Sequence, residues 1–135
     1  MSSVAIAQDE NVALRCLIVD DSPHFLKAAR TLLEREGVEV VGLVSTGDDA
    51  ERHAEELAPD VTLVDVDLGG ESGFDVARRL ADGQERPRSE VILTSAYDER
   101  DFADLIEASP ALGFVSKAEL SRRAIDDLLS GLPDT

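Results

Sequence analysis

The sequence predicts an α/β domain built on a parallel five-stranded sheet with helices on both faces, a doubly wound three-layer sandwich. Short apolar runs typical of buried strands alternate five times with longer segments in which apolar residues recur at helical spacing. Strands that alternate with helices pair in parallel through right-handed crossovers, which cover both faces of the sheet. We expect one domain at 14–131, between a flexible tail at 1–13 and a short tail at 132–135.

The expected elements follow one another in regular order. The apolar runs that we expect to form strands are 15–19, 38–44, 61–64, 91–93 and 113–116. Side chains that favour helix N-caps stand before four helical patterns: Ser22 (followed by Pro23), Thr46 (as a capping box with Asp49), Ser72 and Asp98. Apolar residues at the inward spacing include Leu105 in the fourth helix and Leu120 in the fifth, and 82–88 is expected to be a polar loop.

Composition and charge exclude several functional classes. The formal net charge is −16, so most of the surface should repel nucleic acid, and we expect no direct contact with it. No apolar run approaches the roughly 20 residues that a membrane span needs, and the N-terminus lacks the features of a signal peptide. Cys16 has no partner for an internal disulfide, which suits a reducing compartment. These features favour a cytoplasmic protein.

Chemically versatile side chains follow four of the five predicted strands. They are Asp20 and Asp21 after the first strand, Asp65 after the third, Thr94 after the fourth and Lys117 after the fifth. The carboxyl ends of parallel strands lie on one edge of the sheet, where ligands bind in open α/β folds. A carboxylate at the end of a buried strand must be solvated, paired or bound to a metal. We therefore expect these five side chains to form one site.

The residue types at this edge suit phosphoryl chemistry with a divalent cation. Mg²⁺ prefers one or two carboxylates together with carbonyls and water, which Asp20, Asp21 and Asp65 can provide. A carboxylate beside the cation can attack a phosphoryl group and form an aspartyl phosphate. Lys117 can offer a positive charge to one phosphoryl oxygen, and the Thr94 hydroxyl can donate a hydrogen bond to another. The sequence thus predicts a Mg²⁺-dependent phosphoryl site.

The order and spacing of these residues resemble the receiver domain of two-component response regulators over nearly the whole chain, from about Arg15 to Leu129. The matching features are Asp20-Asp21, Asp65 with Gly73 eight residues later, Thr94, and the run Gly-Phe-Val-Ser-Lys that ends at Lys117. The resemblance implies a flavodoxin-like (βα)5 fold with strand order 2-1-3-4-5. The resemblance also implies the roles of the site residues. Asp65 would be the phosphoacceptor, and the Mg²⁺ ligands would be Asp20, Asp21, Asp65 and the Asp67 backbone carbonyl. Lys117 and Thr94 would take part in the reaction, and the switch would consist of Thr94 and Phe114 together with Lys117.

The function that the resemblance implies is a signalling switch. Such a domain takes a phosphoryl group from a histidine kinase or phosphotransfer protein and catalyses only its own phosphorylation and dephosphorylation. We expect no separate output domain, so the signal should pass to a downstream protein or a homodimer through the face of the fourth helix, fifth strand and fifth helix. The charges of that face that could pair across a dimer, or within one subunit, are Asp101, Asp104, Glu107, Arg122 and Arg123.

Three positions depart from the pattern of the family. Gly69 and Ala118 stand where receivers usually have prolines, and Asp67 occupies a variable position that tunes the lifetime of the phosphoryl group. None of these departures removes a reacting group. A cis peptide bond costs about 2.5–4 kcal/mol before a residue other than proline, so we expect the Lys117–Ala118 bond to be trans.

Simpler interpretations and one competing function remain open at this point. The aspartates at 20–21 could only favour a helix N-terminus, Phe114 could be a core aromatic, and Lys117 a solvated lysine. His24 is near the expected site, but Mg²⁺ favours oxygen ligands over imidazole. The alternative function is a small phosphatase of the haloacid-dehalogenase type, because Asp65 and Asp67 resemble the paired aspartates of that family. That alternative leaves the acidic pair at 20–21 unexplained.

Overall fold

The computed structural model describes residues 13–82 and 89–131. Five parallel strands form one sheet in the order β2-β1-β3-β4-β5, as predicted. The strands are β1 (Leu14–Val19), β2 (Val38–Val44), β3 (Val61–Asp65), β4 (Glu90–Ser95) and β5 (Gly113–Ser116). Apart from Ala13 and Asp82, the tails predicted at 1–13 and 132–135 and the loop predicted at 82–88 lie outside the described residues.

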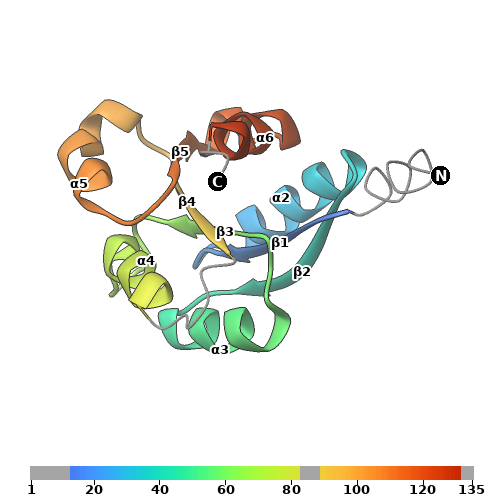
Figure 1. Cartoon of the computed structure of the whole chain (residues 1–135), viewed down its shortest axis with the longest axis horizontal. Coiled ribbons are helices and arrows are strands. Elements are labelled where there is room, and N and C mark those ends of the chain that lie inside the picture. Colours follow the sequence, from blue (N-terminus) through green and yellow to red (C-terminus); the bar gives the residue numbers. More distant parts are fainter. Residues whose placement is uncertain (1–12, 83–88, 132–135) are drawn as a thin grey trace.

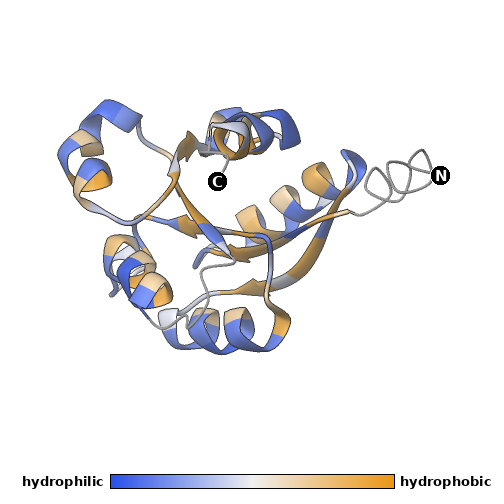
Figure 2. Cartoon of the chain, viewed as in Figure 1, coloured by the Kyte–Doolittle hydropathy of each residue, from blue (hydrophilic) through white to orange (hydrophobic). Residues whose placement is uncertain are grey.

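Helices cover both faces of the sheet, with α2 and α6 on one face and α3 and α4 on the other (Figure 1). The helical elements are α2 (Pro23–Arg35), α3 (Gly47–Leu57), α4 (Gly73–Asp82), η1 (Glu99–Phe102), α5 (Ala103–Ala108), η2 (Lys117–Glu119) and α6 (Arg122–Ser130). Figure 2 shows the reason for the layering: the strands are hydrophobic, and the helices have a hydrophilic side. Burial of these apolar faces is the main driving force for the fold.

Two apolar clusters make up the core, one on each face of the sheet. The first joins β-strand side chains to α3, α4 and the η1–α5 segment through residues such as Ala50, Phe74 and Leu80. The second joins them to α2 and α6 through residues such as Leu33 and Ile125. β3 lies at the centre of the sheet and is buried along its whole length, so its end is held rigidly. Among the described residues, no helix has the length and apolar character to cross a membrane.

The predicted helix starts are largely confirmed. The Ser22 hydroxyl accepts a hydrogen bond from the Phe25 amide at 3.2 Å, and Pro23 opens α2. The Thr46 hydroxyl accepts from the Asp49 amide at 3.1 Å, but the Asp49 carboxylate pairs with Arg52. The capping box at this helix is therefore only half formed.

The fourth helix differs from its prediction. Asp98 precedes a 3₁₀ turn and makes no side-chain cap; its carboxylate pairs with Arg100 at 3.3 Å instead, and the α-helix begins only at Ala103. This change of helix type rotates the side chains, so Leu105, predicted to face inward, is 54% exposed. Leu120 is buried as expected but lies before α6, which Ser121 caps. Every peptide bond in the described part of the chain is trans, including that after Lys117, as predicted.

Candidate functional site

The sheet register brings the predicted site residues to one edge. Val19 at the end of β1 pairs with Val64 of β3, so Asp20 and Asp65 follow side by side. Asp65 in turn pairs with Thr94 of β4. The Val66 amide then donates to the Thr94 carbonyl at 2.9 Å, which extends the pairing by one step beyond β3. The site thus rests on adjacent central strands of the sheet.

Three carboxylates converge at this edge. One oxygen each from Asp20, Asp21 and Asp65 lies within 4.8 Å of the others. Asp20 is fully buried and Asp65 is 6% exposed, whereas Asp21 faces solvent. The Asp20 amide donates to the Val44 carbonyl at 3.0 Å, and its Oδ1 accepts from the Ser22 amide at 2.8 Å. These bonds hold Asp20 at the junction of β1, β2 and α2.

Lys117 supplies a cation between two of these carboxylates. Its Nζ lies 3.0 Å from Asp65 Oδ2, to which it donates a hydrogen bond, and 2.7 Å from Asp20 Oδ2. The ammonium group also sits 4.3 Å from the centre of the Phe25 ring, a favourable cation–π distance. Burial would lower the pKa of Lys117, but its pairing with Asp20 and Asp65 outweighs burial and raises the pKa. Lys117 is therefore positively charged at neutral pH.

The donor set suits a hard divalent cation. Asp20 Oδ2 is buried, and the partner that the structure gives it is the Lys117 ammonium group at 2.7 Å. A buried carboxylate has to be paired or bound to a metal, so this oxygen occupies a position that favours a cation. The carboxylates around it offer only oxygen atoms, which Mg²⁺ prefers to nitrogen. An acidic cluster of this kind is typical of the magnesium site of receiver domains, and His24 is not part of it.

The Asp65 carboxyl group has a raised pKa. Burial is the main cause, and the nearby charge of Asp20 acts in the same direction. The Asp67 amide, which donates to Asp65 Oδ1 at 3.2 Å, and Lys117 act in the opposite direction without cancelling the effect of burial. The protein groups alone thus under-stabilise the ionised form of Asp65, which a bound cation would favour.

The loop between β3 and α4 folds back over the site. The Asp67 carboxylate accepts from the Gly69 amide at 3.1 Å, and the Leu68 amide donates to the Glu71 carbonyl at 2.9 Å. Gly69 has φ +82°, and a Cβ there would lie 3.1 Å from Asp21 Oδ2. Proline has φ near −65°, so the residue usual in receivers cannot adopt this conformation. Glycine here lets the loop approach Asp21 closely.

Gly73 at the start of α4 touches the backbone of the phosphoacceptor candidate. A Cβ at this position would overlap the Asp65 carbonyl oxygen and would lie 2.7 Å from Val66 Cα. The Gly73 amide donates to the Val66 carbonyl at 2.8 Å, which fixes the helix start against the strand end. The spacing of eight residues between Asp65 and Gly73 therefore has a steric cause: only glycine fits there.

Aromatic rings lie behind the strand ends. Phe114 of β5 is 8% exposed and packs on Phe102 of η1, whose ring centre is 6.3 Å away. Phe102 in turn packs on Phe74 of α4 at 6.1 Å. Thr94 is buried on the strand beside Phe114. Phe114 thus belongs to the core, as its simpler interpretation predicted, and its ring is already turned inward.

Sequence reasoning missed two features of the site. One is the contact of Phe25 with Lys117, although the place of Phe25 three residues after the capping Ser22 puts it in the first helical turn beyond the acidic pair. The contacts of Glu71 and Arg79 near the loop were also missed, because the residues that meet there come from distant parts of the sequence. No spacing rule within one element could have brought them together.

Comparison with known proteins agrees with this geometry. The family model described as "Response regulator receiver domain" matches residues 16–129. The chain is 38% identical over 105 residues to protein-glutamate methylesterase/protein-glutamine glutaminase 5 of Myxococcus xanthus, and 34% identical over 107 residues to response regulator GacA of Pseudomonas aeruginosa. Each match covers 77% of this chain, which spans only 30% and 48% of those two proteins.

A solved structure is similar as well. The crystal structure of a two-component response regulator of the LuxR family from Aurantimonas sp. SI85-9A1 superposes with a TM-score of 0.78 at 27% sequence identity. The superposition covers 89% of this chain and 87% of that one. The sheet order, the acidic cluster and the family match therefore agree.

Proposed function

Because this chain belongs to the response regulator receiver family, we propose that it accepts a phosphoryl group on Asp65 from a histidine kinase. Receiver domains are signalling domains that switch through a phosphoaspartate, rather than enzymes in the usual sense, and the family implies a cognate kinase. The observation that best supports Asp65 is its position: it ends the central strand β3, within 4.8 Å of two further carboxylates. The family match also disfavours the phosphatase alternative, since it accounts for the acidic pair at 20–21.

The proposed metal is Mg²⁺, held by Asp20, Asp21, Asp65 and the backbone carbonyl of Asp67. When bound, the cation would neutralise the negative charge of the carboxylates and of the incoming phosphoryl group. The buried Oδ2 of Asp20 supports this assignment, because it already faces a cation, the Lys117 ammonium group at 2.7 Å. Asp67 keeps its own carboxylate in a turn with the Gly69 amide, so only its carbonyl is proposed as a ligand.

In the proposed reaction, a carboxylate oxygen of Asp65 forms a bond to phosphorus as the bond from phosphorus to the donor histidine nitrogen breaks. The electron pair of that bond leaves on the imidazole nitrogen. Lys117 then exchanges its contact with Asp65 for one with a phosphoryl oxygen, and the Thr94 hydroxyl donates to another oxygen. The short distance from Lys117 Nζ to Asp65 Oδ2, 3.0 Å, supports this role.

We propose that phosphorylation favours the inward position of Phe114. Thr94 and Phe114 lie on paired strands, so a shift of Thr94 toward the phosphoryl group changes the space beside the ring. The inward ring in this structure packs on Phe102, which joins β5 to the segment leading into α5. Phosphorylation would act by shifting the balance between inward and outward positions of the ring.

The output surface that we propose is the face of α5, β5 and α6, where a downstream protein would dock. Leu105 of α5 is exposed, Tyr97 is exposed in the loop before η1, and the acids on η1 and α5 include Asp101, Asp104 and Glu107. This combination favours a basic, amphipathic partner surface. A homodimer is less favoured, because Arg122 already binds Glu36 and Asp126 within the chain.

Intact-mass measurement after incubation with acetyl phosphate and Mg²⁺ tests the proposed function. The wild-type protein should gain one phosphoryl group, Asp65→Asn should gain none, and Asp75→Asn should behave as the wild type. Asp75 is a matched control, an exposed acid of α4 that pairs only with Arg78 among the described residues. Phosphorylation of the Asp65 variant at the wild-type rate would exclude Asp65 as the acceptor.

Sedimentation of the beryllofluoride-treated protein tests the output proposal. The wild type should stay monomeric, since we propose a different protein as the partner. A dimer that is lost on Arg123→Glu would replace partner docking by self-association on this face.

A further inference from the structure

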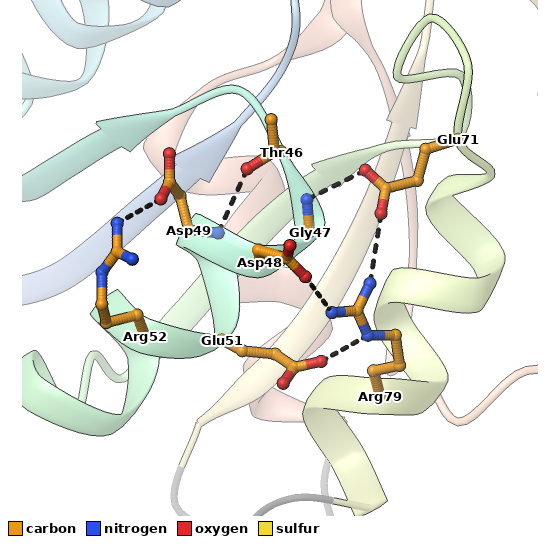
Figure 3. A network of polar contacts seen from close by, with 8 residues as sticks. All are labelled: Thr46, Gly47, Asp48, Asp49, Glu51, Arg52, Glu71 and Arg79. Atoms are coloured by element: carbon orange, nitrogen blue, oxygen red, sulfur yellow. Dashed lines mark hydrogen bonds and ion pairs between the residues drawn. The ribbon is translucent and has the colours of Figure 1, made fainter.

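Arg79 of α4 contacts three carboxylates that come from two other parts of the chain (Figure 3). Its Nη2 lies 2.7 Å from Asp48 Oδ1, its Nε binds Glu51, and its Nη1 lies 3.1 Å from Glu71 Oε2. Asp48 and Glu51 belong to α3, whereas Glu71 belongs to the loop between β3 and α4. We call these four residues the Arg79 cluster. Each of the three guanidinium nitrogens has a carboxylate partner, and the contacts with Asp48 and Glu51 raise the pKa of Arg79.

Glu71 differs from the other two acids because both of its carboxylate oxygens and its backbone are engaged. Oε1 accepts from the amide of Gly47, the first residue of α3, at 3.0 Å. Oε2 accepts from Arg79, and the Glu71 carbonyl accepts from the Leu68 amide at 2.9 Å. Figure 3 shows the Glu71 carboxylate between the helix start and the guanidinium group. One side chain therefore ties the loop to two helices.

The Glu71 and Arg79 side chains occupy the space that a side chain at position 47 would need. A Cβ on Gly47 would lie 2.5 Å from Glu71 Oε2, 2.7 Å from Arg79 Nη1 and 2.9 Å from Val76 Cγ2. Real Cβ contacts are not this short, so the approach of the two side chains requires glycine at the start of α3. The N-terminus of a helix also favours a carboxylate electrostatically.

The same loop determines the shape of the phosphoryl site. The turn that Glu71 closes contains Gly69, whose backbone approaches Asp21, and it follows Asp67, whose amide donates to Asp65. A displacement of Glu71 would thus move a proposed metal ligand, the Asp67 carbonyl. If Arg79 only joined α4 to α3, its contacts with Asp48 and Glu51 would be sufficient. The additional contact with Glu71 connects Arg79 to the loop beside the phosphoryl site.

We propose that Arg79 is a positioning residue for the phosphoryl site, which it controls through Glu71 and the turn at 68–71. Without the guanidinium charge, Glu71 would face Asp48 and Glu51 with no cation between them, and repulsion would move the turn outward. This inference rests on the proposed function, since its consequence is weaker binding of Mg²⁺. Groups that orient metal ligands from outside the ligand shell typically change metal affinity by about 10–100-fold when they are lost.

The test compares Arg79→Gln with Arg78→Gln by titration of Mg²⁺ into ¹⁵N-labelled protein. Arg78 is the matched control, because it is the preceding residue and pairs with exposed Asp75 at 3.2 Å. Arg79→Gln should raise the dissociation constant of Mg²⁺ about tenfold, the lower end of that range, because Arg79 acts through an intervening side chain. It should also shift the amide signals of Leu68 and Gly69 before any metal is added. Arg78→Gln should leave both unchanged.

Three further variants separate positioning from simple stabilisation. Glu71→Gln should weaken Mg²⁺ binding like Arg79→Gln, and the double variant should be no worse than either single one. The Asp48→Asn/Glu51→Gln double variant should lower the melting temperature but leave Mg²⁺ affinity within about twofold, because the Glu71 contact survives. If Mg²⁺ affinity follows melting temperature across all these variants, or if Arg79→Gln leaves it unchanged, Arg79 is only a structural clip.

The proposed function can fail separately. If the wild-type protein binds no Mg²⁺, the metal assignment is wrong, and the amide shifts of the metal-free variants still decide whether Arg79 holds the turn. Normal shifts at Leu68 and Gly69 in metal-free Arg79→Gln would overturn the positioning role on their own.

Discussion

Gly73→Ala should destabilise the protein far more than its added methyl group suggests. The new Cβ would overlap the Asp65 carbonyl oxygen and would also lie 2.7 Å from Val66 Cα. Neither neighbour is a flexible side chain, since both are backbone atoms of the central strand and its extension. The Val66 amide is bonded to the Thr94 carbonyl at 2.9 Å, so the strand cannot move away without loss of sheet hydrogen bonds.

The magnitude follows from these contacts. Overpacking against a fixed neighbour costs about 1–3 kcal/mol, and a backbone obstacle favours the upper half of that range. If α4 moves instead, the bond of 2.8 Å from the Gly73 amide to Val66 is lost, at a cost of about 1 kcal/mol. The higher helix propensity of alanine returns at most about 1 kcal/mol. We expect a net loss of about 2–3 kcal/mol, which is a drop of about 8 °C in melting temperature for a domain of this size.

Thermal unfolding monitored by circular dichroism, in EDTA, measures this loss. Gly70→Ala is the control, since a Cβ at Gly70 meets no atom within 4 Å, and its effect should stay within about 0.5 kcal/mol. Gly73→Ala should also slow phosphorylation by acetyl phosphate, because the alanine displaces the backbone of Asp65. A Gly73→Ala melting temperature within 2 °C of the Gly70→Ala value, taken here as roughly the threshold of a meaningful difference, would refute the steric argument.

Three other predictions concern charge and exposure. The folded-state pKa of Asp65 is raised, so without metal the protonated form stabilises the protein, and this stabilisation is lost as the pH rises from the ordinary value of 3.8 through the raised one. Asp65→Asn should lack that loss, so it should unfold at a higher temperature than the wild type at pH 7 in EDTA and gain less from added Mg²⁺. Equal melting curves of the two proteins would contradict this. Lys117→Met should cost about 2–3 kcal/mol in EDTA, less than the roughly 3–5 kcal/mol of breaking a fully buried ion pair, because the Lys117 side chain is 19% exposed. Millimolar Mg²⁺ should recover part of this loss, and a loss that Mg²⁺ leaves untouched would show that Lys117 does not balance the carboxylates. Leu105→Ser should change the free energy of unfolding by no more than about 0.5 kcal/mol, because that side chain is 54% exposed; a larger loss would restore the inward position predicted from the sequence.

The positions of the strand ends could be predicted because they depend on local patterns. The apolar runs before Asp20, Asp65 and Lys117 are short and bounded, and parallel strands must end at the same edge. Hydrophobic burial fixes which polar residue follows each apolar run, although the structure places Asp65 and Thr94 within the last residues of β3 and β4 rather than after them. The chemistry of the site is therefore a consequence of where each apolar run stops, which the sequence displays directly.

The start of the fourth helix could not be predicted by the same rules. Asp98 has the residue type of an N-cap, but nearby cations compete with the helix amides for its carboxylate. Here Arg100 binds that carboxylate. The helix register, and with it the exposure of Leu105, then depends on how Phe102 packs between Phe74 and Phe114. Such packing joins residues distant in sequence, so no local pattern could reveal it.

The loop after β3 shows the same limit in the site itself. The sequence marks Gly69 as a departure from the proline usual in receivers, but not the direction in which the backbone turns. Its φ of +82° follows from the turn that Asp67 and Glu71 close around it. Glycine is required once that turn is fixed from outside by Arg79. The departure at Gly69 and the Arg79 cluster therefore belong to the same loop conformation.

The charge balance among the side chains of the site indicates how phosphorylation could be transmitted. Lys117 holds Asp20 and Asp65 together, with its ammonium group beside Phe25, and it is the cation that an incoming phosphoryl group would attract. Lys117 directly follows β5 and opens η2, so any exchange of its partners pulls on the strand that bears Phe114. The contact that stabilises the metal-free form would thus be the one that changes on phosphorylation. Stability without metal and response to the phosphoryl group should accordingly change together when Lys117 is substituted.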